Sequence, residues 1–506
     1  MRTLHEAVEA VETYSPAEEQ FNRRRRATGL ILAPTLLVAM ILLPIPVPWP
    51  AHKMAGIIAA VMVLWVTEAL PLSASALLGP TLAVILQVAP VRTALASFAD
   101  PTIFLFIGAF MLAEGMFVHK LDRRIAYTAL SWRAVGSSAA RVLIVYGAVA
   151  TVLSMWISNT ATTAMLFPIG MSLIGQIRRG GTGRSMHRFA MAMMLITAFG
   201  ASIGGMATPV GTPPNLIGIG MLERIGGIRL GFFDWMAIGL PAVIIMFGVM
   251  CLVLCFLGAR GVTMPSGGTD AVREELRKLG ALSPGERNVL IAFGTTIVLW
   301  IAPGIFAIAG LGGTPFAAAY DASMPEGVAA ICGALLLFLL PVDWRSRKFT
   351  LTWEEASNID WGIVLLFGGG LALGQLAFST GLADALGRGI TSFLPTQSTA
   401  AITILFTGTA IVLSEATSNT AAANMIVPVA IAVAQAAGIR ALEPALGATL
   451  GASMGFMMPV SSPTNAIVYS SGHVPITSMM RHGVVLDLIG FVVISLVVLT
   501  LCPLLF

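Results

Sequence analysis

Apolar runs close to the length of a membrane span recur along almost the whole chain of 506 residues, and they constrain the fold more than any other feature. A helix of about 20 residues crosses the hydrocarbon core of a bilayer, and in lipid only helices or closed barrels satisfy every backbone group. Charged residues make up 11% of the chain, too few to cover a water-exposed surface. The sequence therefore predicts an all-α polytopic membrane protein and excludes soluble enzymes and nucleic-acid-binding proteins.

The apolar runs predict about 11 transmembrane helices and two re-entrant hairpins. The hairpins are expected at 141–177 and 398–437, where a Ser-Asn-Thr cluster interrupts a run that is long for a single helix. Two further spans, 189–222 and 445–469, are expected to be broken at 211–215 and at 462–465, where proline and asparagine stand together. The remaining spans are expected at 28–47, 54–70, 72–89, 102–118, 235–257, 289–309, 326–340, 363–379 and 483–505.

A hydrophilic stretch at 258–288 divides the apolar part of the chain into two halves and is interpreted as a cytoplasmic linker. The first repeat is then 27–257, the second is 289–506, and residues 1–26 form an N-terminal tail. The four cysteines lie in apolar stretches and are interpreted as packing residues, which gives no support to a disulfide framework.

The distribution of lysine and arginine predicts the orientation of the chain in the membrane. Four consecutive arginines, Arg23 to Arg26, stand directly before the first apolar run, and most of the 29 basic residues fall in loops on the same side. Because basic residues are retained on the cytoplasmic side, we expect a plasma (inner) membrane protein with its N-terminus in the cytoplasm and its C-terminus outside. The first hairpin then enters from the cytoplasm and the second from outside.

The two halves carry the same polar motif. Residues 154–161 and 414–421 match at five of eight positions, with Ser-Asn-Thr at 158–160 and again 260 residues later at 418–420. The break loops repeat as well, because Asn215 recurs as Asn465, 250 residues later. Polar and helix-breaking residues are costly in a bilayer, so their repetition indicates function. Oppositely inserted copies of one motif form an inverted repeat, which is typical of secondary transporters.

The four motif regions, 154–161, 205–215, 414–421 and 455–465, contain no lysine, arginine or histidine. Helix N-termini present unpaired N–H groups to an anion, while freed carbonyls and hydroxyl or amide oxygens can replace the water around a small cation. An anionic substrate would then be held by neutral donors, with its charge balanced by cations bound beside it. This pattern favours cation-coupled anion uptake.

At these residues the chain resembles the divalent anion/sodium symporter family over about residues 27 to 506. The twin Ser-Asn-Thr motifs are the most specific mark, and Gly-Thr-Pro-Pro-Asn at 211–215, Ile-Phe-Leu-Phe-Ile-Gly at 103–108 and Leu-Leu-Phe-Gly-Gly-Gly at 365–370 support them. The resemblance implies sodium-coupled symport of a small divalent anion by a homodimer, with an elevator-type motion. It implies no covalent cofactor, no enzyme activity, and membrane lipid as the surroundings.

The resemblance also implies which residues hold the ions and the substrate. One sodium site would comprise Ser154, Ser158, Asn159 and Gly211. A second would comprise Ser414, Ser418, Asn419 and Ser461. The substrate would contact Ser158, Asn159, Thr160, Thr212, Ser418, Asn419, Thr420 and Ser462.

The second break loop departs from the family pattern, because Thr464 stands where a second proline is usual. The change frees one backbone N–H and can alter the second sodium site or the substrate preference. The favoured substrate is a C4-dicarboxylate such as succinate, malate or fumarate. A sulfate or citrate carrier, a sodium-independent exchanger and a proton-coupled carrier stay open as alternatives, as does a gated anion channel from a different class. Glu415, beside the second motif, can orient a serine, carry a proton or be structural.

Overall fold

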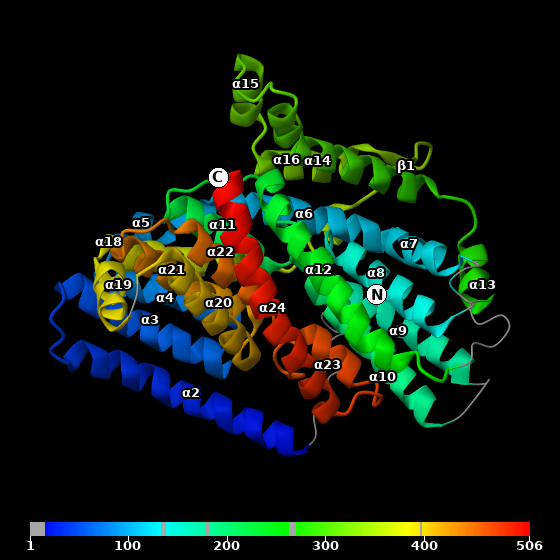
Figure 1. Ribbon diagram of the computed structural model, residues 1–506. Coiled ribbons are helices and arrows are strands. Elements are labelled where there is room, and N and C mark those ends of the chain that lie inside the picture. The colour runs from blue at the N-terminus through cyan, green and yellow to red at the C-terminus, as the bar shows by residue number, and fades with distance from the viewer. Residues whose placement is uncertain (1–15, 133–134, 136–137, 179–182, 263–269, 395–396) are drawn as a thin grey trace.

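The computed structural model describes residues 16–132, 135, 138–178, 183–262, 270–394 and 397–506. This part of the chain is almost entirely helical (Figure 1), and its one sheet pairs β1 (Pro341–Asp343) with β2 (Lys348–Phe349). Eleven of the described helices are long and apolar enough to cross a membrane. The total is twelve if the bent pair α15 (Pro315–Ser323) and α16 (Glu326–Leu339) forms one span. The predicted all-α polytopic fold is confirmed.

The first helix of the described residues, α2 (Pro16–Leu42), begins inside the segment that the sequence assigned to a polar tail. Its apolar span starts at Glu19, so the four arginines lie on the helix and not in an irregular tail. Alanine, glutamate, glutamine and arginine are good helix formers, which explains why the helix extends beyond the apolar run. The helix packs on α3 (Trp49–Thr67) along one edge of the molecule (Figure 1).

The rest of the first half contains short connecting helices between longer ones. The expected span at 72–89 is a shorter helix, because Gln87 adopts a positive φ of 55° and Pro90 follows three residues later. The elements are α4 (Leu72–Ile85), α5 (Val91–Leu95), the 3-10 helix η1 (Ala96–Ala99), α6 (Pro101–Val118) and α7 (Leu121–Leu130).

Two helical hairpins are each followed by a broken helix, as the motifs predict. The first hairpin is α8 (Ala139–Ser154) with α9 (Asn159–Arg178), and the broken helix is α10 (Arg184–Gly205) with α11 (Pro213–Arg224). The second hairpin is α20 (Thr399–Ala416) with α21 (Asn419–Ala436), followed by α22 (Leu442–Gly451) and α23 (Pro463–Tyr469). The long helices α12 (Phe232–Gly258) and α24 (Ile476–Leu505) complete the two halves and pack side by side (Figure 1).

The expected linker at 258–288 contains a helix, α13 (Asp270–Leu279), which packs on α7. Arg273 Nε donates to the Ser131 carbonyl at 3.0 Å, which attaches this helix to the first half. The next span, α14 (Pro284–Ile308), begins inside the expected linker because Ser283 and Glu286 form a capping box ahead of the apolar run. The remaining helices are α17 (Trp353–Ala356), α18 (Trp361–Ser379) and α19 (Leu382–Phe393).

The first segment of the broken helix in the first half, α10, is almost completely buried within the protein. In α10, 94% of the apolar span is buried, against 11% of the span in α2. Helix α10 packs against α8, α9, α12 and α23, so it contacts both halves of the chain. A helix enclosed in this way is shielded from lipid and can end in a polar, irregular loop at membrane depth.

The close packing of α10 on α8 leads to a prediction about glycine. A Cβ at Gly204 would lie 2.1 Å from the Thr151 carbonyl oxygen, so we expect Gly204→Ala to force the helices apart and lower the free energy of unfolding by about 1–3 kcal/mol. Thermal unfolding of the purified protein in detergent measures this change. The control is Gly175→Ala on α9, where a Cβ meets no atom within 4 Å, and equal loss in both variants would contradict the prediction.

Candidate functional site

The tip of the first hairpin joins three of the predicted site residues. Helix α8 ends at Ser154 and α9 begins at Asn159, with the Ala161 N–H donating to Ser158 Oγ at 3.3 Å. Ser154 Oγ donates to Asn159 Oδ1 at 2.7 Å, and Asn159 Nδ2 donates to Thr212 Oγ1 at 3.4 Å. The hairpin therefore contacts the break loop of its own half through the Asn159 amide.

The tip of the second hairpin repeats this arrangement. Ser418 caps α21 by accepting the Ala421 N–H at 3.3 Å. Ser414 Oγ lies 2.8 Å from Asn419 Oδ1 and 2.7 Å from the Ala452 carbonyl oxygen, so its single proton can bond to one of these acceptors at a time. The serine-to-asparagine contact is thus the same in both halves.

One asparagine closes each break loop in the same way. Asn215 Nδ2 donates to the carbonyls of Gly205 at 2.8 Å and Thr208 at 2.7 Å. In the second half Asn465 Nδ2 donates to the corresponding carbonyls, those of Gly455 at 2.9 Å and Met458 at 3.0 Å. We call these two residues the staple asparagines. The repeat of 250 residues in the sequence is therefore a repeat of loop geometry.

The staple asparagines were part of the repeat in the sequence but not among the predicted site residues. Both are 0% exposed, and each keeps a buried Oδ1 without a hydrogen-bond donor in the described part of the chain. The signal that could have found them was the shared offset of Asn215 and Asn465, because an asparagine in a broken helix has freed carbonyls to bond.

The hairpin tips lie directly over the glycines of the break loops. A Cβ at Gly205 would lie 2.3 Å from Asn159 Oδ1, and one at Gly455 would lie 3.0 Å from Asn419 Oδ1. Only glycine admits the tip asparagine so close to the backbone. A third glycine, Gly211, has the same restriction, since a Cβ there would lie 2.5 Å from the Gly205 carbonyl oxygen.

The sequence placed both interruptions too late. The loops run over 206–212 and 452–462, whereas 211–215 and 462–465 were expected. Pro213 and Pro463 are the first residues of α11 and α23, a position where a helix needs no N–H and the fixed φ of proline is suitable. The prolines therefore mark where each second helix starts.

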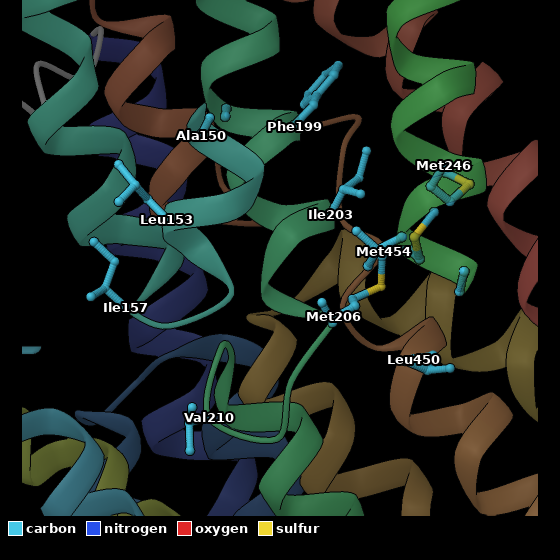
Figure 2. Packing of buried hydrophobic residues seen from close by; sticks show 14 of the residues in the cluster. Ala150, Leu153, Ile157, Phe199, Ile203, Met206, Val210, Met246, Leu450 and Met454 are labelled. Atoms are coloured by element: carbon cyan, nitrogen blue, oxygen red, sulfur yellow. The ribbon is translucent and has the colours of Figure 1, made fainter. Parts of the chain in front are cut away.

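The two broken helices pack against each other in the interior of the molecule. Helix α23 packs against α9 and α11 against α21, so each broken helix also contacts the hairpin of the other half. The rings of Phe199 and Phe456 are 5.0 Å apart, edge to face. Figure 2 shows Met206 and Met454, one from each loop, among the residues of the same buried apolar cluster. This packing brings the two halves of the predicted site into one region.

The predicted site residues differ in how far they are exposed. Ser154 and Ser414 are fully buried at 0% exposure, and Ser461 is 1% exposed. The tip residues Ser158, Thr160, Ser418, Asn419 and Thr420 are half-buried. The Thr160 and Thr420 hydroxyls form no hydrogen bond within the described part of the chain. The inner oxygens can enclose a small cation, and the outer groups can reach a ligand.

Glu415 lies behind the second tip. Its Oε1 accepts the Met457 N–H at 2.7 Å, and its carboxyl group faces that of Asp487 on α24. Glu415 is 8% exposed and Asp487 is 6% exposed. The helices that pack on α24, namely α12, α20 and α22, contain no lysine or arginine. The hydrogen bond from the Met457 N–H to Glu415 therefore fastens the second break loop to the hairpin.

The described residues hold no cluster of three or more histidine, cysteine, aspartate or glutamate side chains that could bind a metal ion. All four cysteines are free. The oxygens gathered at the tips come from hydroxyl, amide and carbonyl groups, which are ligands for hard cations such as sodium and not for transition metals.

Comparison with known proteins agrees with this architecture. The family model described as the sodium:sulfate symporter transmembrane region matches residues 24–506. A protein of Staphylococcus saprophyticus named sodium-dependent dicarboxylate transporter SdcS is 32% identical over 484 residues, which cover 94% of this chain and 91% of that protein. Its namesake from Staphylococcus aureus strain USA300 is 32% identical over 483 residues, with the same coverage.

A solved structure also shares the fold. The YdaH transporter of Alcanivorax borkumensis, described as having an unusual topology, superimposes with a TM-score of 0.55 over 89% of this chain and 98% of that chain. Its sequence is 13% identical, so the likeness concerns the fold alone. The family match over almost the whole chain and the 32% identity of full-length relatives carry the assignment. The chain therefore belongs to the sodium:sulfate symporter family, which confirms its resemblance to the divalent anion/sodium symporters.

Proposed function

We propose that this protein is a secondary active transporter that carries a small divalent anion together with sodium, and that the anion is a C4-dicarboxylate. The observation that carries the proposal is the pair of matching hairpin tips, each fixed by the same serine-to-asparagine contact at 2.7 and 2.8 Å. The staphylococcal relatives named as sodium-dependent dicarboxylate transporters support the choice of ion and substrate.

The sodium sites are proposed at the inner face of each tip. Ser154 and Asn159 meet the loop that contains Gly211, and Ser414 and Asn419 meet the loop that contains Ser461. The oxygens there are uncharged and largely buried, which suits an ion that sheds its water. Two monovalent cations would balance a dianion, so the occupied site would carry no net charge from its ligands.

The dianion is proposed to bind at the outer groups of both tips. Helices α9 and α21 begin at Asn159 and Asn419, so the partial positive charge of each N-terminus accumulates there. The hydroxyls of Thr160 and Thr420, which lack partners within the described residues, can donate to carboxylate oxygens. Hydrogen bonds to charged acceptors are the stronger ones, which compensates for the missing lysine and arginine.

The proposed motion is of the elevator type, with a homodimeric scaffold in a plasma (inner) membrane. Its support within the chain is that the hairpins, the broken helices, α12 and α24 pack on one another. Such a body can move as a unit against α2 to α7 and α14 to α18. The N-terminus is proposed in the cytoplasm and the C-terminus outside, on the basis of the arginines at 23–26.

Uptake into proteoliposomes tests the proposed function. We expect labelled succinate to accumulate against its gradient when sodium is present outside, and not when choline replaces it or when a proton gradient is imposed alone. An internal succinate concentration that never exceeds its equilibrium value would indicate a channel. Accumulation without sodium, or of sulfate or citrate in place of succinate, would overturn the proposed coupling or substrate.

The tip asparagines give a prediction that separates the site from the fold. We expect Asn159→Ala and Asn419→Ala each to abolish sodium-dependent uptake. Each variant removes an amide that lies between the inner oxygens proposed to bind sodium and the outer groups proposed to bind the substrate. Expression level and elution volume on size exclusion should stay unchanged. Asn358→Ala, at an exposed position outside the site, is the matched control and should transport normally. Full uptake in either tip variant would remove the proposed site.

The inner serines predict a change in sodium dependence. We expect Ser154→Ala and Ser414→Ala to raise the sodium concentration at half-maximal uptake by roughly ten-fold, since each loses one hydroxyl oxygen from a buried cation site. Uptake over a range of sodium concentrations at saturating substrate measures this value. Ser323→Ala, whose hydroxyl bonds only to its own helix, serves as the control. An unchanged sodium dependence in both inner variants would rule out these serines as ligands.

A further inference from the structure

The two break loops share their staple asparagines but differ at one position beside them. Pro214 follows the helix-starting proline of the first loop, and Thr464 follows that of the second. Proline has no N–H, and Thr212 makes no side-chain cap on α11. The Thr464 N–H donates to Ser462 Oγ at 3.2 Å, so α23 begins with a side-chain cap. The exchange of proline for threonine therefore supplies the cap that the first loop lacks.

The Thr464 hydroxyl adds two further contacts. It hydrogen-bonds to Ser462 Oγ, and it lies 3.3 Å from Ser202 Oγ on α10 of the first half. The three side chains are buried, with exposures of 1% for Thr464, 5% for Ser462 and 1% for Ser202. Both the N–H and the hydroxyl of Thr464 thus engage the oxygen of Ser462, and the cluster is anchored across the interface between the halves.

This engagement changes the surroundings of the tip asparagine. In the first half, Thr212 Oγ1 accepts a hydrogen bond from Asn159 Nδ2 at 3.4 Å. In the second half the corresponding oxygen, Ser462 Oγ, is held by Thr464, and Asn419 Nδ2 has no acceptor in the described part of the chain. Asn419 Oδ1 remains fixed by Ser414 at 2.8 Å. Asn419 is half-buried, whereas Asn159 is 9% exposed.

We propose that Thr464 is a positioning residue which, by holding Ser462 Oγ, leaves the Asn419 amide free to donate to one carboxylate of the transported anion. This inference rests on the proposed function, because it takes the second tip as a substrate contact. The two tips then offer different donors in spite of their matching motifs. The second tip binds a carboxylate oxygen through an amide N–H that the first tip uses internally.

A series of substitutions at Thr464 separates its two contributions. Thr464→Pro gives the second loop the proline pair of the first and removes both the N–H and the hydroxyl, so Ser462 Oγ becomes available to the Asn419 amide. We expect the KM for succinate uptake to rise about ten-fold or more, the effect of losing one hydrogen bond to a charged group. Thr464→Val keeps the N–H and should raise KM by about three-fold. Thr464→Ser keeps both the N–H and a hydroxyl, so its KM should equal that of the wild type.

The measurement must distinguish positioning from stability. Initial rates of sodium-dependent uptake over a range of succinate concentrations give KM and the maximal rate, and thermal unfolding is followed alongside. If Thr464 acts by positioning, its substitution raises KM, while the maximal rate stays within about two-fold and the unfolding temperature within a few degrees of the wild-type values. If its role is purely structural, the maximal rate and the unfolding temperature fall before KM changes. Thr409→Val is the matched control, since that hydroxyl bonds only to the Leu405 carbonyl on its own helix.

The outcomes separate this inference from the proposed function. Wild-type protein that shows no sodium-dependent uptake of succinate, and no thermal stabilisation by succinate with sodium, would overturn the proposed function and this inference with it. An active wild type with an unchanged KM in Thr464→Pro would overturn the inference alone. If Thr464→Pro does not fold, Thr464→Val decides, and a wild-type KM in that variant overturns the inference. A raised KM in Thr464→Ser would also contradict the inference.

Discussion

A helix that is interrupted inside a membrane protein exposes backbone groups that lipid cannot satisfy. In both halves, the staple asparagines form hydrogen bonds to carbonyl groups of this kind. Asn215 and Asn465 each bind two carbonyls that the break sets free, at distances between 2.7 and 3.0 Å. With these carbonyls fixed, the loop keeps one shape, and the hairpin tip can lie on its glycine. The proposed sodium and substrate sites at each tip depend on this closure, because both would use atoms whose positions the loop defines.

The repeat extends beyond the loops to the helices that cover them, but it does not extend to their charge. A Cβ at Gly239 of α12 would lie 2.5 Å from the Met206 carbonyl oxygen, and a Cβ at Gly483 of α24 would lie 2.5 Å from that of Phe456. Four residues after each glycine stand Val243 in the first half and Asp487 in the second. On the hairpins, the position of Glu415 is occupied by Met155. The same backbone arrangement therefore carries apolar side chains at these two positions in the first half and two carboxyl groups in the second.

The sequence predicted the helical membrane fold, the two hairpins and the repeat, because each depends on hydropathy or on polar residues that have no local reason to lie in an apolar run. It did not predict where the helices are broken, since Pro213 and Pro463 can be read either as the break itself or as the start of the next helix. The extension of α2 into the polar tail was missed for a similar reason, because hydropathy marks the membrane boundary and helix propensity continues beyond it. The bond between Ser202 and Thr464 joins residues far apart in the sequence, and only the packing of α23 beside α10 reveals it.

The absence of fixed positive charge at the tips has a consequence for release as well as for binding. A lysine or arginine about 4 Å from a carboxylate in a partly buried site contributes roughly 4 kcal/mol of attraction, which slows departure by about three powers of ten. In the proposed mechanism the balancing charge belongs to sodium ions, which can leave with the anion. In the same proposed mechanism, helix termini, hydroxyls and the Asn419 amide would supply the donors that select a dianion without retaining it. A site built from neutral groups around mobile cations is therefore better suited to repeated binding and release than a permanently basic pocket.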